Sequence, residues 1–160
     1  MFHQSLVAVT FSLLEISMKT ALFCKNCNAR LSNWLCEIDT VEEMNRLCDL
    51  RNDDRYEEEV HPVPRGHVLV MANEVLRERQ QAVPGWNPEG YPENWMNLND
   101  ILKEVTLTNI PSRLNGCCGL DGCDGPNRIC GCGIEVGTES SDCWTWHMFV
   151  PATDNTYWKK

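Results

Sequence analysis

The sequence predicts an α+β fold, in which a small antiparallel sheet carries two cysteine-bearing turns and an inserted segment supplies short helices and strands. The chain has 160 residues, of which 42% are apolar and 23% charged. These values are typical of one globular domain with a single core. Ten cysteines, several of them in close groups, point to sulfur chemistry. Apolar residues flank the close groups, as turns between short strands require. We therefore expect one domain over residues 18–160.

Residues 1–17 are expected to be a peripheral or dispensable extension. Their apolar run, Leu6–Leu14, follows no Lys or Arg, ends at Glu15 and precedes no small-residue cleavage site, so it is a poor export signal. An amphipathic helix is the alternative. No stretch of the chain approaches the ~20 apolar residues of a membrane span. We predict a cytoplasmic, reducing location, in which close cysteine pairs bind metal rather than form disulfides. An exported disulfide protein remains the alternative.

The segment between the cysteine-bearing turns reads as an insertion over residues 37–110. Thr40 and Glu43 match a capping box and predict a helix over 39–50. Residues 67–72 and 104–107 read as strands, and Asn97 can cap a short helix. Residues 82–94 are rich in Pro and predict a loop.

Two short motifs have the features of zinc knuckles. They are FCKNCNARLS at residues 23–32 and ICGCGIEV at residues 129–136. Each has an apolar residue before its first Cys, a tight turn between two thiols, and a segment able to form a strand afterwards. Gly131 and Gly133 permit the backbone angles of such a turn. Together the motifs offer four thiolates, which satisfies tetrahedral Zn²⁺ with no open position. The predicted ligands are Cys24, Cys27, Cys130 and Cys132.

This arrangement resembles a zinc ribbon, here split by the long insertion between its knuckles. The second pair is C-x-C rather than the usual C-x₂-C. The segment RLNGCCGLDGCDGPNRICGCGIEVGTESSDCW also resembles a family of uncharacterised small Cys-rich bacterial proteins. That resemblance implies a metal scaffold and no particular reaction.

A second metal site is an open alternative near the second knuckle. Cys143 and His147 have C-x₃-H spacing and could join Cys117 or Cys118. Adjacent cysteines point in different directions in most backbones, so both binding one ion is not expected. The competing interpretations are that these residues pack the core, or that Cys143 or Cys118 is a nucleophile with a histidine base.

Two further features near the C-terminus have ordinary structural interpretations. Residues 121–127 alternate Asp, Gly and Asn, which predicts tight turns in preference to a calcium loop. Trp144 and Trp146 are expected on one side of a strand, packed around the metal site.

The function expected from these observations is a zinc-binding module with a structural Cys₄ site that binds another protein and is not an enzyme. The alternatives are a thiol-based redox or metal sensor, or a small Cys/His zinc enzyme. The net charge of −9 makes nucleic acid an unfavourable partner. The oligomeric state does not follow from the sequence.

Overall fold

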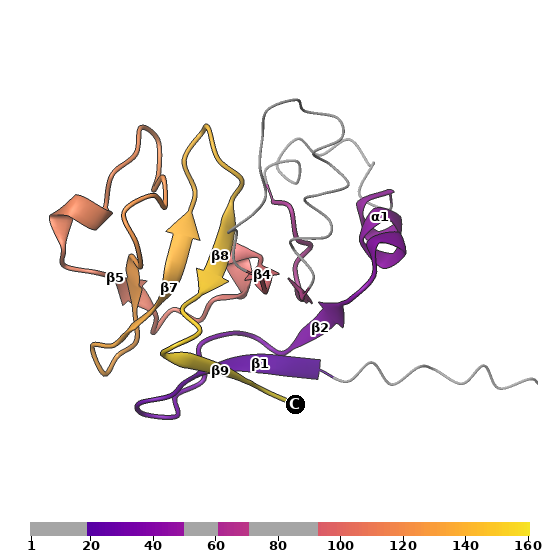
Figure 1. Cartoon of the computed structure of the whole chain (residues 1–160), viewed down its shortest axis with the longest axis horizontal. Helices are drawn as coiled ribbons and strands as arrows, with labels where there is room; N and C mark the ends of the chain where they lie inside the picture. The colour runs from indigo at the N-terminus through magenta and orange to yellow at the C-terminus, as the bar shows by residue number, and fades with distance from the viewer. Residues whose placement is uncertain (1–18, 50–60, 71–92) are drawn as a thin grey trace, which may run out of the picture.

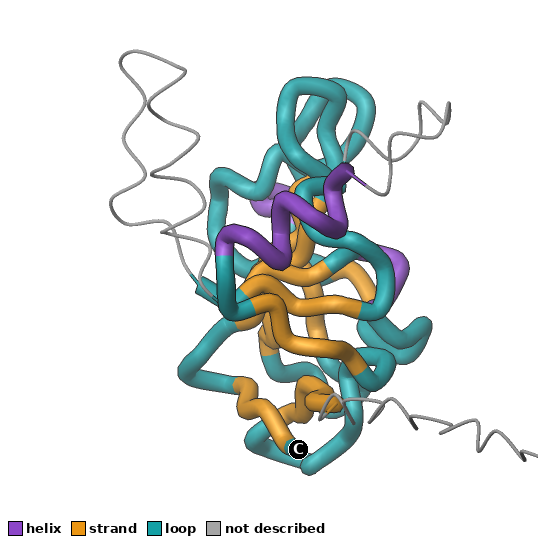
Figure 2. The backbone as a smooth tube through the Cα atoms, turned by 90° about the vertical axis from the view of Figure 1, so that its right-hand side faces the viewer, coloured by secondary structure: helices purple, strands orange, loops and turns teal. Residues whose placement is uncertain are grey.

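The computed structural model describes residues 19–49, 61–70 and 93–160, and within them nine strands form one sheet (Figures 1 and 2). The strands are β1 (Lys19–Cys24), β2 (Leu35–Ile38), β3 (His67–Leu69), β4 (Trp95–Met96), β5 (Thr106–Leu107), β6 (Arg128–Ile129), β7 (Glu135–Ser140), β8 (Met148–Pro151) and β9 (Thr156–Lys159). Their order across the sheet is β5-β6-β7-β8-β4-β3-β2-β1-β9. Among these nine strands, only β2 and β3 pair in parallel, so the sheet is mixed.

The predicted α+β fold with a small antiparallel sheet is therefore wrong. The strands of the expected insertion do not form a separate unit. Strand β3 pairs with β2 and β4 pairs with β8, so the insertion lies in the middle of one continuous sheet. In the described ranges there is one α-helix, α1 (Val41–Asp49), besides the 3₁₀ turns η1 (Leu98–Asp100) and η2 (Pro111–Arg113). No helix in these ranges has the length and apolarity to cross a bilayer.

Several local predictions in the insertion are confirmed. Helix α1 begins after Thr40, whose Oγ1 accepts the N–H of Glu43 at 3.2 Å. Asn97 caps η1 by accepting the N–H of Asn99 at 2.9 Å. The expected strands are shorter than predicted, at His67–Leu69 and Thr106–Leu107. The predicted segment 1–17 and most of the loop 82–94 lie outside the described residues.

Two groups of buried side chains form the core. The first packs around Leu22, Leu35, Met96 and Phe149 and includes the sulfurs of the buried Cys24 and Cys130. The second lies beneath α1 and is built on Ile38, Met44, Val63, Leu69 and Trp95. Burying a Leu or Phe side chain contributes about 1.5–3 kcal/mol. The first group therefore fixes two of the predicted metal ligands in the interior of the fold.

Gly137 permits close packing between β7 and β8. A Cβ at this position would overlap the ring of Phe149 and lie 2.6 Å from the carbonyl oxygen of Val150. Gly137→Ala should lower the free energy of unfolding by about 1–3 kcal/mol, because the buried ring has to shift. Gly131→Ala is the matched control, because Gly131, unlike Gly133, does not have the positive φ expected for it, and its Cβ would meet nothing within 4 Å. Urea denaturation of both variants checks the prediction, and equal midpoints would contradict it.

Candidate metal centre

The first cysteine-bearing turn begins where β1 ends. The N–H of Cys24 donates to the carbonyl of Ala29 at 2.9 Å, and the N–H of Asn28 donates back to the carbonyl of Cys24 at 2.9 Å. Asn28 has φ 59°, a left-handed conformation that Asn adopts more readily than most residues. The chain thus reverses between Cys24 and Ala29, and Cys27 lies within the turn.

The second turn follows β6 and has a similar construction. The N–H of Cys130 donates to the carbonyl of Ile134 at 2.9 Å, and the N–H of Gly133 donates to the carbonyl of Cys130 at 2.8 Å. Gly133 has φ 85°, which a residue with a Cβ rarely adopts. Cys132 is exposed at the tip of the turn.

The two turns bring four sulfurs together at one end of the sheet. The Sγ atoms of Cys24, Cys27, Cys130 and Cys132 all lie within 4.8 Å of one another. Cys24 Sγ is 3.7 Å from Cys132 Sγ, and Cys27 Sγ is 3.5 Å from Cys130 Sγ. A tetrahedral zinc site with Zn–S bonds of about 2.3 Å has sulfurs about 3.8 Å apart, whereas a disulfide bond is about 2 Å long. The spacing thus fits four ligands around one ion.

The residues of the loop between β8 and β9 hold the two turns against each other. The N–H of Lys25, in the first turn, donates to the carbonyl of Asn155 at 2.9 Å. The side-chain amide of Asn155 donates to the carbonyl of Glu135, just after the second turn, at 2.9 Å. Strand β9 also pairs with β1 in a register that places Cys24 opposite Thr156. The site is therefore positioned by hydrogen bonds from the Lys25 main chain and the Asn155 side chain, which do not involve the sulfurs.

Backbone N–H groups also point at the sulfurs. Burial raises the pKa of the Cys24 thiol, while hydrogen bonds from the N–H groups of Cys27 and Asn26 oppose the shift. Burial raises the pKa of Cys130 to about 12, against a hydrogen bond from the N–H of Cys132. The Asn26 side chain, followed by the N–H of Ile134, lowers the pKa of Cys132 to about 6. Such N–H···S contacts stabilise thiolates, and a bound cation would displace the remaining protons.

Three more thiols form a second cluster. The Sγ atoms of Cys117, Cys118 and Cys143 lie within 4.8 Å of one another, and all three residues are exposed. The structure does not add His147 to this group. The His147 ring instead lies edge-on to His61, with ring centroids 5.4 Å apart.

The carboxylate of Asp142 organises this second cluster. Its Oδ1 accepts the backbone N–H groups of Cys117 at 3.2 Å, Cys118 at 2.7 Å and Cys143 at 2.9 Å. The hydrogen bonds from Cys118 and Cys117 lower the pKa of Asp142 to about 2, so the carboxyl group is ionised at neutral pH. A side-chain hydrogen bond with Cys118, together with burial, raises the pKa of Cys143 to about 12, so the metal-free thiol is protonated at neutral pH.

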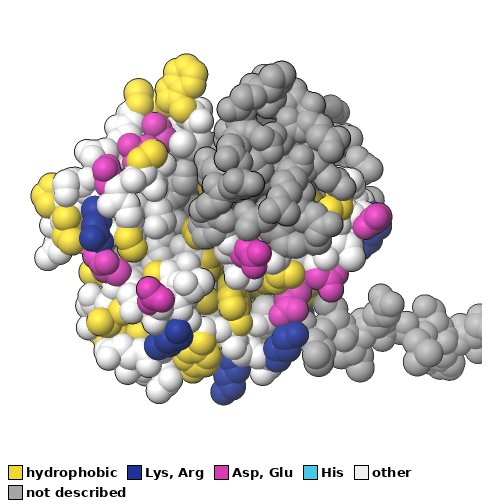
Figure 3. Space-filling model, viewed as in Figure 1, with side chains coloured by type: hydrophobic (Ala, Val, Ile, Leu, Met, Phe, Trp, Pro, Cys, Tyr) yellow, Lys and Arg dark blue, Asp and Glu magenta, His cyan; other side chains and the backbone are white. Residues whose placement is uncertain are grey.

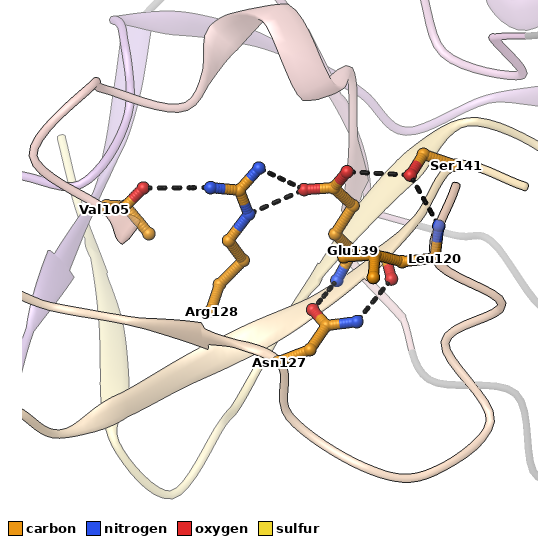
Figure 4. Close-up of polar contacts among 6 residues, drawn as sticks. All are labelled: Val105, Leu120, Asn127, Arg128, Glu139 and Ser141. Carbon is orange, nitrogen blue, oxygen red and sulfur yellow. Dashed lines mark hydrogen bonds and ion pairs between the residues drawn. The ribbon is translucent and has the colours of Figure 1, made fainter. Parts of the chain in front are cut away.

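A buried polar network connects the strand pair β6–β7 to the loop that carries Cys117 and Cys118 (Figure 4). Arg128 donates from Nε to Glu139 Oε2 at 2.6 Å and also forms an ion pair with it through a second nitrogen. Glu139 Oε1 accepts from Ser141 Oγ at 2.8 Å, and Ser141 Oγ accepts the N–H of Leu120 at 3.1 Å. Asn127 completes the network through both polar atoms of its amide, which pair with the main chain of Glu139.

The predictions for Trp144 and Trp146 and for residues 121–127, the Asp-Gly loop, have different outcomes. Trp144 and Trp146 are not on a strand, because residues 142–145 form a turn before β8. Trp144 is 86% exposed, and Trp146 packs edge-on against Trp95 in the core beneath α1, away from the four sulfurs. In the Asp-Gly loop, Asp121 Oδ1 accepts the N–H of Cys123 at 2.9 Å, which confirms the predicted tight turn.

Sequence reasoning missed an aromatic surface beside the four sulfurs. Phe23 stacks on Tyr157 with ring centroids 5.7 Å apart and lies edge-on to Trp34 at 6.5 Å. The ammonium group of Lys159 lies 5.8 Å from the centre of the Phe23 ring. The available signal was Phe23, which is only half-buried between the buried Leu22 and Cys24 in β1. It becomes part of a surface only through the pairing with β9, which places Phe23 opposite Tyr157.

Comparisons of the chain with protein-family models, with curated proteins and with solved structures give no match. The resemblance to small Cys-rich bacterial proteins therefore stays a prediction from the residues.

Proposed function

We propose that this protein is a non-enzymatic zinc-binding module in which one ion, held by Cys24, Cys27, Cys130 and Cys132, stabilises the fold, and that the module binds another protein. The observation that carries the proposal is the convergence of the four sulfurs within 4.8 Å. Four thiolates fill the tetrahedral shell of Zn²⁺, so no position is left for substrate or water. That argument favours a structural role over a catalytic one at this site.

The chemistry of the donor set supports zinc. Thiolates are soft ligands, and a tetrahedral set of four suits zinc or iron–sulfur chemistry. Cys24 and Cys130 are buried in the core, while Cys27 and Cys132 face solvent. Four sulfurs within 4.8 Å of one another can surround a single ion, whereas a cluster of several irons would hold its cysteine sulfurs further apart.

Metal analysis tests the structural half of the proposal. Protein purified without added metal and treated with a weak chelator should retain one zinc per chain, with four sulfur scatterers at about 2.3 Å in X-ray absorption. Iron in place of zinc would overturn the choice of metal. Folded protein without any retained metal would overturn the structural role.

The aromatic surface supports the second part of the proposal, that the module binds another protein. Trp34 is 42% exposed, and Phe23 and Tyr157 are half-buried beside it. Aromatic side chains of this kind supply much of the binding energy at protein interfaces. In Figure 3, basic and hydrophobic side chains lie next to each other over β1 and β9, at the bottom of the view. This mixture differs from the acidic balance of the whole chain.

The partner that fits this surface presents an apolar side chain flanked by carboxylates. The apolar group would lie against the rings of Phe23 and Trp34, and the carboxylates would face the exposed Arg30 and Lys159. Rim charges of this kind steer association more than they add affinity. We therefore expect binding to weaken moderately, and to slow, at high salt.

A pair of tryptophan variants tests the surface. Partners cross-linked to the native protein should be lost with Trp34→Ala, at a cost of about 2 kcal/mol or more in binding. They should be retained with Trp144→Ala, which removes an even more exposed ring outside the surface. Equal capture by both variants would refute a role for this surface, and it would leave the zinc measurement unaffected.

The cytoplasm is the compartment we propose. Nine cysteines whose side chains the structure describes form no disulfide with one another. Six of them are exposed: Cys27, Cys117, Cys118, Cys123, Cys132 and Cys143. Exposed thiols persist in a reducing environment and are oxidised outside it. Thiol counting by mass spectrometry on protein from its natural source tests the assignment.

A further inference from the structure

We propose that Cys117, Cys118 and Cys143 form a second, exchangeable metal site, which binds a thiophilic d¹⁰ ion, copper(I) or zinc, through three thiolates. This site is separate from the Cys₄ centre and goes beyond a structural role.

The spacing of the three sulfurs is that of ligands to one ion. Cys117 Sγ and Cys118 Sγ are 3.9 Å apart, and all three sulfurs lie within 4.8 Å of one another. Three sulfurs around a central ion at bonds of about 2.3 Å are about 4 Å apart. Adjacent cysteines rarely point at one centre, so this arrangement needs a specific cause in the backbone.

The cause is a tightly packed loop. Gly116 has φ 147°, and a Cβ there would overlap the carbonyl of Gly119. A Cβ on Gly119 would in turn overlap the main chain of Ser141. The carbonyl of Leu120 accepts the N–H groups of Ser141 at 2.8 Å and Asp142 at 3.0 Å. The segment with two of the thiols is therefore fixed against the segment with the third.

Asp142 acts as a positioning residue for the site. It is buried, and a single oxygen of its carboxylate accepts the N–H groups of all three cysteines. This contact sets the orientation of each Cys main chain before any ion arrives. Hydrogen bonds that orient metal ligands in this way commonly change metal affinity by about 10–100-fold.

Exposure makes the site exchangeable. All three cysteines face solvent, in contrast to the half-buried Cys₄ centre. Soft thiolates select copper(I) and zinc among the common metal ions. Copper(I) is satisfied by three sulfurs, while zinc would keep one position for water or for a ligand supplied by another molecule. Either ion can therefore enter and leave without unfolding the chain.

The two cysteine clusters can be measured independently. Cys132 precedes β7 and Cys143 follows it, so the clusters lie towards opposite ends of this strand. Six extended residues span about 20 Å, so an ion at one end does not contact the other cluster.

An anaerobic competition titration tests the proposal. Full-length reduced protein with its Cys₄ centre loaded is titrated with copper(I) against a chromophoric chelator, and in a parallel arm with Zn²⁺. We expect one further equivalent of at least one ion to bind, with Cys117, Cys118 and Cys143 protected from alkylation and the first zinc retained. Cys143→Ser should weaken binding at least 100-fold, while Cys123→Ser, an exposed thiol outside the cluster, should not change it.

Two Asp142 variants separate positioning from general stability. Asp142→Asn keeps an oxygen that can accept the three N–H groups and should retain affinity within tenfold, whereas Asp142→Ala should lose about 10–100-fold. The proposal is overturned if neither ion binds beyond the first zinc, if Cys143→Ser binds as tightly as native protein, or if copper(I) binds only by expelling that zinc. A chain that lacks zinc in the Cys₄ centre but still binds an ion at these three thiols would refute the proposed function and leave this site intact.

Discussion

Cys24→Ser should both release the proposed structural zinc and unfold the protein. Cys24 is fully buried at the end of β1, so a serine there removes a ligand and leaves a hydroxyl group in the core. Zinc binding to a Cys-rich site contributes directly to folding, because the site does not exist in the unfolded chain. We expect the free energy of unfolding to fall by at least about 4 kcal/mol, with loss of solubility. Elemental analysis and urea denaturation measure both effects.

Cys36→Ser is the matched control for this variant. Cys36 is half-buried in β2, directly beside β1, and does not belong to either sulfur group. It should change stability by less than about 1 kcal/mol and keep the zinc. Cys132→Ser, at an exposed ligand, should lose the metal as well. If Cys24→Ser or Cys132→Ser stayed soluble with stoichiometric zinc, the assignment of ligands would be wrong.

The second large effect is expected at Glu139. Glu139→Ala leaves the guanidinium of Arg128, in the described part of the chain, with only the carbonyl of Val105 as a hydrogen-bond partner, at 3.2 Å (Figure 4). The two side chains of the pair are only 12% and 25% exposed. Removing one partner of a largely buried ion pair costs about 3 kcal/mol, because the remaining charge is desolvated. Denaturation of the variant by urea should show a loss of this size.

A surface pair and a double variant control for this result. Glu37→Ala breaks the more exposed contact with Lys160, so we expect a loss below about 1 kcal/mol. Replacing Arg128 and Glu139 together by Met and Leu should recover much of the stability, since no charge is left unpaired. If Glu139→Ala and Glu37→Ala were equally mild, the network would have no role in holding β6, β7 and the 117–120 loop together.

The convergence of the four sulfurs of the candidate metal centre could be predicted from the sequence because the signal is local. Two close pairs of thiols, each in a turn with an apolar residue before it, indicate one tetrahedral site wherever the intervening chain goes. Thr40 and Asn97 were predictable as caps for the same reason, since each acts within three residues of itself.

The sheet could not be predicted from the sequence because it depends on pairing between strands that are far apart along the chain. Strands β4, β5 and β6 have two residues each, too few to show any alternation. The joining contact, Met96 with Phe149, connects residues far apart in the sequence. Short strands of this kind form only when their neighbours are in place, so propensity alone reads them as loops around a small sheet.

The second sulfur cluster could be predicted from the sequence only in part. Its cysteines were recognised, but His147 was expected with them, and two adjacent thiols were not expected to share a centre. The deciding contacts are those of Asp142 with three backbone N–H groups, which no spacing of residues reveals. Trp144 was misplaced by the same turn, because Asp142 and Thr145 close it just before β8.

The separation of the two knuckles along the chain has a consequence for biosynthesis. Cys27 and Cys130, neighbours in the finished site, are 103 residues apart. At translation rates of about 5–20 residues per second, the first thiol pair leaves the ribosome roughly 5–20 s before its partners exist. During that interval a nascent chain offers two unshielded sulfurs and an unpaired β1 edge, so oxidants and wrong metals compete for them until synthesis reaches the second pair.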